Sequence, residues 1–375
     1  MNERVAELLD ELVALPTVSE TSNQALIELL IRHLESLGAE CRVVPGAAGR
    51  ANLLARLGPP VRGGLMLCAH TDVVPPGGGW ATAPFRLTRV DDRLHGRGTA
   101  DMKGFIATVI AALETVDPRV LSAPVHFLGS YDEEVGCRGV RDVLPLLHDD
   151  GAMAPRLVVV GEPTMMRPRH SHLGKVGVRL TVRAAEAHSS RAANSPSAIV
   201  HAARFVRALD AIQASCPVTD GAPPFVVNCG SIHGGTQTNV IAGECVVTFE
   251  VRHDTERDPD LLLEPLRAAI AESLPSLQAV GGGVDWHEVT RYPAMRTDTA
   301  DDAFRAAVRI ADGGPSSDLG FGTEGGLFSE ALGAPVVICG PGDIADAHRP
   351  DEFVAIDQLD RSQRFVEGLV EHFCC

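Results

Sequence analysis

The stretch Ala69-His-Thr-Asp-Val-Val-Pro75 decides how the fold of this chain is interpreted. It follows the apolar run Leu65-Met-Leu-Cys68, which two glycines bound upstream. A short apolar run between chain breakers predicts a buried strand, so the polar residues lie just past its carboxyl end. In open α/β sheets, ligands bind at that end of the strands. His70 is therefore a candidate metal ligand with Asp72 orienting its ring, although a surface hydrogen-bonded pair is the simpler interpretation of these two residues alone.

Composition and charge limit the class of protein. The chain has 375 residues, 45% apolar and 22% charged, which is enough for two globular domains. Its formal net charge of −16 disfavours nucleic acid and anionic membranes as partners. The N-terminus lacks the apolar core of a signal peptide, no apolar run approaches the roughly 20 residues that span a bilayer, and the cysteines lack zinc-type spacing. We expect a cytoplasmic protein that binds neither nucleic acid nor membrane.

The first part of the chain alternates strand and helix patterns. Apolar residues at helical spacing predict helices over 4–15, 22–37 and 104–116. Short apolar runs predict strands over 40–44, 51–57, 65–69, 125–130 and 157–160. Strands that are apolar throughout indicate an α/β domain with a mainly parallel sheet covered by helices.

The pattern changes after residue 175. The stretches 176–183 and 244–252 alternate apolar and polar residues, which is typical of an antiparallel sheet with one solvated face. One helical pattern begins at Asn194-Ser-Pro196, and another covers 258–274. We predict an inserted α+β domain over 176–285. Residues 1–175 and 286–375 would form the first domain, which closes with helices over 301–312 and 324–332 and a strand over 335–339.

Several acidic residues and histidines follow predicted strands or lie in the loops after them. They are His70, Asp101, Glu133, Glu134, Glu162 and His348. Imidazoles combined with carboxylates suit zinc, cobalt or manganese better than calcium, which takes oxygen ligands. Neighbouring side chains in extended backbone point in opposite directions, so one member of the Glu133–Glu134 pair can bind a metal while the other stays free as a base. Taken singly, each carboxylate is better explained as a solvated surface residue or a helix cap, because acidic residues are mostly exposed.

The loop Gly96-Arg-Gly98 admits a second interpretation, as part of a dinucleotide-binding fingerprint. No third glycine stands at the required position, however, and no strand runs directly into the loop. We therefore do not expect a dinucleotide cofactor.

In combination, these motifs resemble the zinc aminoacylase family, which includes acetylornithine deacetylase, succinyl-diaminopimelate desuccinylase and carboxypeptidase-like members. The resemblance covers nearly the whole chain. In the first domain it is carried by His70-Thr-Asp72, Gly96-Arg-Gly-Thr-Ala-Asp-Met-Lys-Gly104, Asp132-Glu-Glu-Val-Gly136, Gly161-Glu-Pro-Thr164 and Ala347-His-Arg-Pro-Asp-Glu352. In the inserted domain it is carried by Ala187-His-Ser-Ser190 and Gly230-Ser-Ile-His-Gly-Gly-Thr-Gln-Thr-Asn239.

The resemblance implies a di-zinc aminopeptidase-like catalytic domain with an inserted lid and dimerisation domain. One divalent ion, zinc or cobalt, would be held by His70, Asp101 and Glu162. The other would be held by Asp101 as bridge, Glu134 and His348. The resemblance further implies that Asp72 orients His70 and that Glu133 is the general base.

The resemblance also implies substrate contacts and a homodimer. His188, from the lid of a partner subunit, would stabilise the oxyanion with Asn239 nearby; the alternative is a loop-capping histidine. Arg252 would meet a substrate carboxylate, and its alternative is a strand-face salt bridge with Glu250. Glu324 would meet a substrate amine, and its alternative is a carboxylate at a helix N-terminus.

Within the family, the stretches 321–330 and 339–348 look most like acetylornithine deacetylases. The implied activity is a metal-dependent amidohydrolase acting on a small N-acylamino acid, namely N2-acetyl-L-ornithine in arginine biosynthesis. The alternatives are another N-acylamino-acid hydrolase, such as succinyl-diaminopimelate desuccinylase or a dipeptidase, and a non-catalytic scaffold relative. Ala100 and Leu173 depart from the family pattern, in which Ser and Lys are frequent at these positions.

Overall fold

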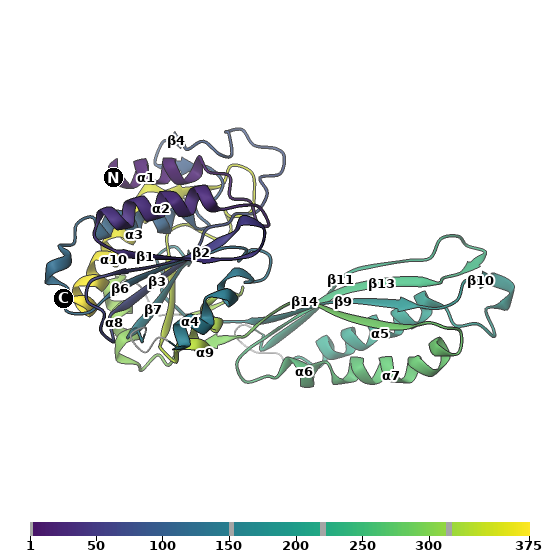
Figure 1. The fold of residues 1–375 in the computed structure, drawn as a ribbon. Coiled ribbons are helices and arrows are strands. Elements are labelled where there is room, and N and C mark those ends of the chain that lie inside the picture. The colour runs from purple at the N-terminus through teal and green to yellow at the C-terminus, as the bar shows by residue number, and fades with distance from the viewer. Residues whose placement is uncertain (1–2, 150–153, 218–222, 313–316) are drawn as a thin grey trace. The chain divides into compact units, whose positions relative to one another are not determined.

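The computed structural model describes residues 3–149, 154–217, 223–312 and 317–375 (Figure 1). It divides the chain into two compact units. One consists of Met1–His172 with Met295–Cys375, and the other of Leu173–Ala294. No helix among the described residues combines the length and apolar composition needed to cross a bilayer.

The first unit is built on a large mixed sheet. Its strands are β1 Glu40–Pro45, β2 Ala51–Leu57, β3 Leu65–His70, β6 Val125–Ser130, β7 Leu157–Pro163, β8 Arg169–His172, β15 Met295–Arg296, β16 Ser317–Leu319 and β17 Val336–Gly340. Their order is β1-β2-β6-β3-β7-β17-β8-β15, with β16 paired to β8. The central strands β6, β3, β7 and β17 run parallel, whereas β1, β2 and β15 pair antiparallel with their neighbours. A separate small sheet contains β4 Thr88–Val90, β5 Arg93–His95 and β18 Phe353–Ala355.

Helices cover both faces of this sheet. They are α1 Glu3–Val13, α2 Gln24–Ser36, α3 Lys103–Leu113, α4 Leu144–Asp149, α8 Asp302–Ile310, α9 Gly325–Leu332 and α10 Ile356–Cys374. The helices α1, α3 and α10 pack together over alternate strand residues such as Leu65 and Leu67, whereas α9 contacts α4 and β17. Because both faces are covered, all six residues of β3 are buried. The predicted helix-covered, mainly parallel sheet is confirmed.

The second unit is an antiparallel sheet with helices on one face. Its strands are β9 Gly174–Arg183, β11 Phe225–Gly234, β13 Glu244–His253 and β14 Gly283–Tyr292, in the order β11-β13-β9-β14, and a short ribbon pairs β10 Ala187–His188 with β12 Val240–Ile241. Its helices are α5 Ala198–Ala214, α6 Pro259–Leu262 and α7 Glu264–Gln278. Alternate residues of β9 from Val176 to Val182 are buried with residues of α5 and α7, as the apolar–polar alternation predicted.

The second unit extends beyond the predicted 176–285 domain. Strand β14 pairs with β9 and continues to Tyr292, so the chain returns to the first unit at Met295 rather than at residue 286. A β-bulge between Glu288 and Thr290 shifts the register of this strand. The shift interrupts the period-two pattern on which recognition of a strand from sequence depends.

Candidate metal centre

The carboxyl ends of the parallel strands gather the predicted ligands. His70 is the last residue of β3, and Glu162 is the penultimate residue of β7. Glu134 follows β6, His348 follows β17, and Asp101 lies just before α3. Neighbouring parallel strands end at the same edge of a sheet, so residues distant in sequence meet there.

Two groups of candidate metal ligands share one carboxylate. His70, Asp101 and Glu162 form the first donor group, and Asp101, Glu134 and His348 form the second; the donor atoms within each group all lie within 4.8 Å of one another. Oδ1 of Asp101 lies 2.9 Å from Nε2 of His70, and Oδ2 lies 3.1 Å from Nε2 of His348. Nε2 of His348 also lies 3.0 Å from Oε1 of Glu134. Asp101 thus offers a different oxygen to each group, as a carboxylate that bridges two ions does.

The charges of these side chains fit a pair of divalent cations. Burial, reinforced by the charge of Asp101, raises the pKa of Glu162 well above its ordinary value and also raises that of Glu134. Hydrogen bonds to Asp101 and Glu134 raise the pKa of His348 to about 10. Carboxylates packed this closely repel one another unless positive charge lies between them. Mixed imidazole and carboxylate donors suit zinc and its neighbours in the first transition series.

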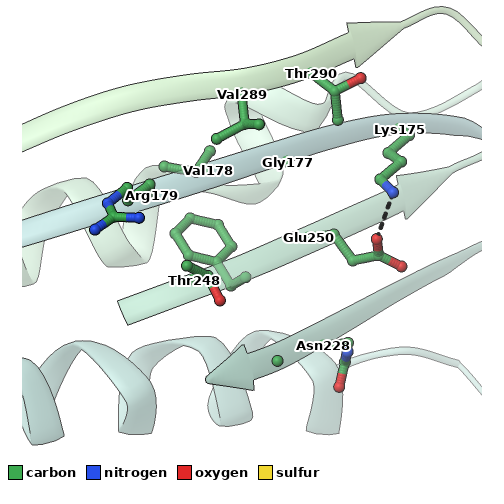
Figure 2. A pocket seen from close by; sticks show the side chains of 11 residues that line it. Lys175, Gly177, Val178, Arg179, Asn228, Thr248, Glu250, Val289 and Thr290 are labelled. Atoms are coloured by element: carbon green, nitrogen blue, oxygen red, sulfur yellow. Dashed lines mark ion pairs between the residues drawn. The ribbon is translucent and has the colours of Figure 1, made fainter. Parts of the chain in front are cut away.

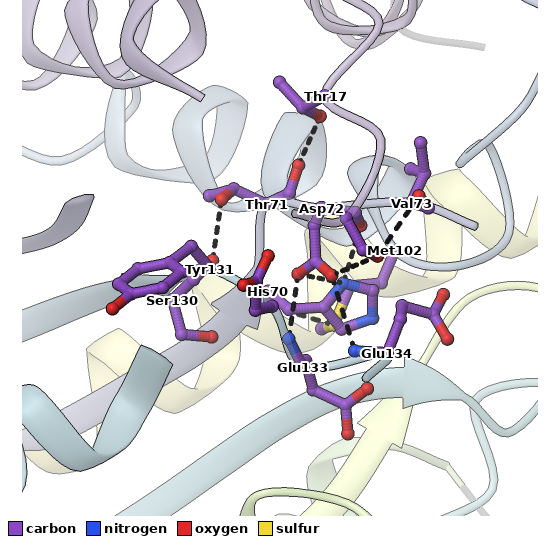
Figure 3. Close-up of polar contacts among 12 residues, drawn as sticks. Thr17, His70, Thr71, Asp72, Val73, Met102, Ser130, Tyr131, Glu133 and Glu134 are labelled. Atoms are coloured by element: carbon purple, nitrogen blue, oxygen red, sulfur yellow. Dashed lines mark hydrogen bonds and ion pairs between the residues drawn. The ribbon is translucent and has the colours of Figure 1, made fainter. Parts of the chain in front are cut away.

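Asp72 supports two parts of the site (Figure 3). The Nδ1–H of His70 donates to the backbone carbonyl of Asp72 at 2.9 Å, whereas the Asp72 carboxylate lies 3.7 Å from the same nitrogen. The carboxylate instead accepts the backbone N–H groups of Glu133 at 3.0 Å and of Glu134 at 3.4 Å, and the Ser19 hydroxyl at 2.7 Å. In this structure, the backbone of Asp72 orients the imidazole, and the side chain holds the turn after β6.

Glu133 lies outside both donor groups. Its backbone is fixed by Asp72, and its Oε1 accepts the Cys137 thiol at 3.3 Å. Burial raises the pKa of Glu133 well above its ordinary value; the charge of His70 lowers it, and that of Glu134 raises it further. A carboxylate that lies beside candidate metal ligands but outside both donor groups can serve to move a proton.

Glu324 is buried in the first unit at the N-terminus of α9, the position that the alternative interpretation gave it. Its Oε2 accepts the Ser130 hydroxyl at 2.9 Å, and its Oε1 accepts no hydrogen bond from the described residues. Burial raises the pKa of this carboxyl to about 7.

The remaining predicted residues belong to the second unit. His188 is exposed, and its Nδ1 accepts the backbone N–H of Ser190 at 3.2 Å, which is the loop-capping contact of its alternative interpretation. Asn239 is adjacent, because its carbonyl accepts the N–H of Ser189 at 2.9 Å. Arg252 donates to Glu250 at 2.9 Å, which is the strand-face ion pair.

A pocket of about 380 Å³ lies in the sheet of the second unit (Figure 2). Its lining comes from β9, β11, β13 and β14 and consists of Lys175, Gly177, Val178, Arg179, Asn228, Gly230, Thr248, Phe249, Glu250, Val289 and Thr290. Lys175 pairs with Glu250 across it at 2.8 Å. Glu250 therefore neutralises two cations, Lys175 and Arg252.

Three residues around the site had no assigned role in the sequence analysis. Ser19 donates to Asp72, Glu352 accepts the backbone N–H of Asp101, and Arg97 pairs with Glu352. Arg97 and Glu352 lie inside recognised motifs. The only sign of their role in the sequence is that they are charged residues in these motifs that were not assigned as ligands. Ser19 carries no such signal.

Residues 66–372 match the model of peptidase family M20/M25/M40. The chain is 33% identical to an acetylornithine deacetylase of Proteus mirabilis, covering 98% of this chain and 96% of that protein. It is 32% identical to the enzyme of that name from Photorhabdus laumondii, covering 98% and 97%.

Solved structures share the fold. An M20 family metallo-carboxypeptidase from Sulfolobus solfataricus superimposes with a TM-score of 0.79 at 18% identity, covering 99% of both chains. The YXEP protein of Bacillus subtilis, a dinuclear metal-binding peptidase of family M20, superimposes with a TM-score of 0.70 at 17% identity, covering 99% of both chains. The resemblance noted in the sequence is confirmed: the chain belongs to peptidase family M20/M25/M40 and is a metal-dependent hydrolase of amide bonds.

Proposed function

We propose that this protein hydrolyses the amide bond of a small N-acylamino acid, and that its substrate is N2-acetyl-L-ornithine. The observation that carries the hydrolytic part is the pair of donor groups sharing Asp101, with Glu133 beside them and outside both. The substrate rests on the relatives named acetylornithine deacetylase, which match over nearly the whole chain.

In this proposal, His70, Asp101 and Glu162 hold one divalent ion, and Asp101, Glu134 and His348 hold the other. When bound, two such ions lower the pKa of a water molecule and polarise the amide carbonyl. Zinc is the first choice for both positions, and cobalt is accepted by the same ligands.

Glu133 takes the proton of the attacking water and later delivers it to the leaving amine nitrogen. The products are acetate and the free amino acid. The carboxylate of Asp72 accepts the backbone N–H of Glu133 at 3.0 Å, so the base stays beside the donor groups during both proton transfers.

The remaining substrate contacts are also proposals. His188 of a partner subunit donates to the oxyanion, with Asn239 nearby. Arg252 offers its guanidinium to the substrate carboxylate, in exchange for its ion pair with Glu250. Glu324 meets the distal ammonium of ornithine, which would satisfy its unpaired Oε1.

We further propose that the enzyme works as a homodimer through its second unit, in the cytoplasm, as part of arginine biosynthesis. Exposed apolar side chains support the dimer. Ile199 and Val200 on α5 are 40% and 52% exposed, and they line a hollow of about 560 Å³ together with Ser189, the neighbour of His188.

A substrate panel tests the proposed function. Metal-free protein and protein supplied with Zn²⁺ or Co²⁺ are assayed for amine release from N2-acetyl-L-ornithine, N-acetyl-L-methionine, N-succinyl-diaminopimelate and a dipeptide. The proposal predicts metal-dependent release that is fastest with N2-acetyl-L-ornithine. Preference for another compound would refute the substrate but not the hydrolytic site, and absence of release from every compound would refute the activity. The Glu133→Gln variant is the control for contaminating hydrolases.

A further inference from the structure

A buried ion pair lies between the loops that carry two of the predicted ligands. Nη1 of Arg97 donates to Oε2 of Glu352 at 2.5 Å, and each side chain is 1% exposed. Arg97 precedes Asp101 by four residues, and Glu352 follows His348 by four residues. Neither belongs to a donor group.

The second oxygen of Glu352 binds the Asp101 loop directly. Oε1 accepts the backbone N–H of Ala100 at 3.0 Å and of Asp101 at 3.1 Å. The carbonyl of Glu352 accepts the N–H of Gly96 at 3.0 Å. Glu352 is thus a direct connection between the chain segment that carries His348 and the loop that carries Asp101.

Arg97 holds this carboxylate in place. Its guanidinium lies 5.2 Å from the ring centre of Trp80, so the ion pair is enclosed by an aromatic ring as well as by the loops. Burying two charges is costly, and an apolar pair of similar size often stabilises a fold equally well. Stability alone therefore does not explain a charged pair at this place.

We propose that Glu352, held by Arg97, is a positioning residue that fixes Asp101 relative to His348 and so sets the affinity of the second donor group for its cation. This inference rests on the proposed metal site. The effect should be selective, because Glu352 joins the loop of Asp101 to the chain segment of His348, and both residues belong to the second group. In the first group it acts on Asp101 alone, since His70 and Glu162 lie on strands of the sheet.

Asp351 provides a matched control. It is the neighbouring carboxylate on the same loop, and it accepts the backbone N–H groups of Ala81 at 2.9 Å and Thr82 at 3.0 Å. Its carboxylate holds the loop at a different place and accepts no hydrogen bond from the described residues of the Asp101 loop, 96–102. Deleting each carboxylate in turn separates loosening of the loop from loss of the link to Asp101.

The experiment is a Zn²⁺ titration of the metal-free full-length protein by calorimetry. The binding step that disappears in His348→Ala identifies the second donor group. We expect Glu352→Ala to weaken that step by about 10- to 100-fold, the range found when supporting residues of metal ligands are removed. Glu352→Gln should lose less affinity in that step, because its amide oxygen can still accept the two backbone N–H groups. Asp351→Ala should leave both steps unchanged.

Circular dichroism first checks that each variant folds, and if Glu352→Ala does not, Glu352→Gln and Arg97→Lys replace it. Unchanged affinity in the Glu352 variants, an equal loss in both steps, or the same loss in Asp351→Ala would overturn the inference while leaving the metal site intact. A wild-type protein that binds fewer than two ions would refute the proposed site, and the inference with it.

Discussion

The carboxylate of Asp72 accepts the backbone N–H of Glu133 at 3.0 Å. This bond joins the end of β3, where His70 lies, to the turn after β6, which carries the proposed base (Figure 3). The proposed metal ligand at the end of β3 and the proposed base after β6 are thereby linked by one side chain.

Replacing Asp72 by alanine should therefore affect turnover more than metal binding. The ring of His70 is held by the backbone carbonyl of Asp72, which the substitution keeps, whereas the turn of Glu133 loses its acceptor. We expect kcat to fall about 10- to 100-fold with metal content retained. Ser19→Ala, which removes only the hydroxyl donated to Asp72, is the milder control. Loss of metal from Asp72→Ala would contradict this prediction and show that the carboxylate supports a candidate ligand, either His70 or Glu134.

Glu133→Gln should abolish turnover while metal binding persists. The substitution keeps the shape of the side chain and removes its ability to take a proton, and general base catalysis contributes about 10²- to 10⁴-fold. Kinetics combined with metal analysis of the same sample checks this result. A Glu133→Gln protein with full turnover would exclude Glu133 as the base.

Cation binding should release protons at neutral pH. Hydrogen bonds to Asp101 and Glu134 raise the pKa of His348 to about 10, so this imidazole is protonated in the metal-free protein and must lose its proton to bind a metal. Affinity should accordingly rise with pH. Calorimetry in buffers of different ionisation enthalpy counts the protons, and His348→Ala should release fewer. An equal count in both proteins would contradict this prediction.

The stability of the metal-free protein should fall as pH rises through the titration of Glu324. Burial raises the pKa of this carboxyl from 4.5 to about 7. Between these values the unfolded chain loses the proton and the folded protein keeps it, so unfolding becomes more favourable as pH rises, by about 3 kcal/mol in all. Urea unfolding at several pH values should show this decline in the wild type and a shallower one in Glu324→Gln. Parallel curves would contradict the assignment.

The sequence predicts the fold well where burial determines the pattern. β3 lies between two helix layers, so every residue of it is apolar until the polar cluster that begins at His70. The alternation of β9 likewise reports one covered face. The end of the second unit could not be predicted, because the register shift in β14 interrupts the alternation of apolar and polar residues.

Contacts between side chains that are distant in the sequence cannot be predicted from local sequence patterns. The candidate ligands could be identified because their residue types and their places after strands suit a metal. Glu352 and Arg97, by contrast, are 255 residues apart, and only the folded chain shows that they pair. The sequence predicts that the carboxylate of Asp72 orients His70, whereas in the structure the backbone carbonyl does so. The two oxygens lie 2.9 and 3.7 Å from Nδ1 of His70, and no residue pattern encodes so small a difference.

The central claim is that two cations, held by two donor groups that share Asp101, are required for amide hydrolysis. Its most direct test is a titration of metal-free protein with Zn²⁺ in which bound metal and hydrolysis of N2-acetyl-L-ornithine are measured on the same samples. The account predicts two bound ions per chain, with full activity reached only when both donor groups are filled. Hydrolysis at the full rate by the metal-free protein, or saturation at a single ion, would contradict it.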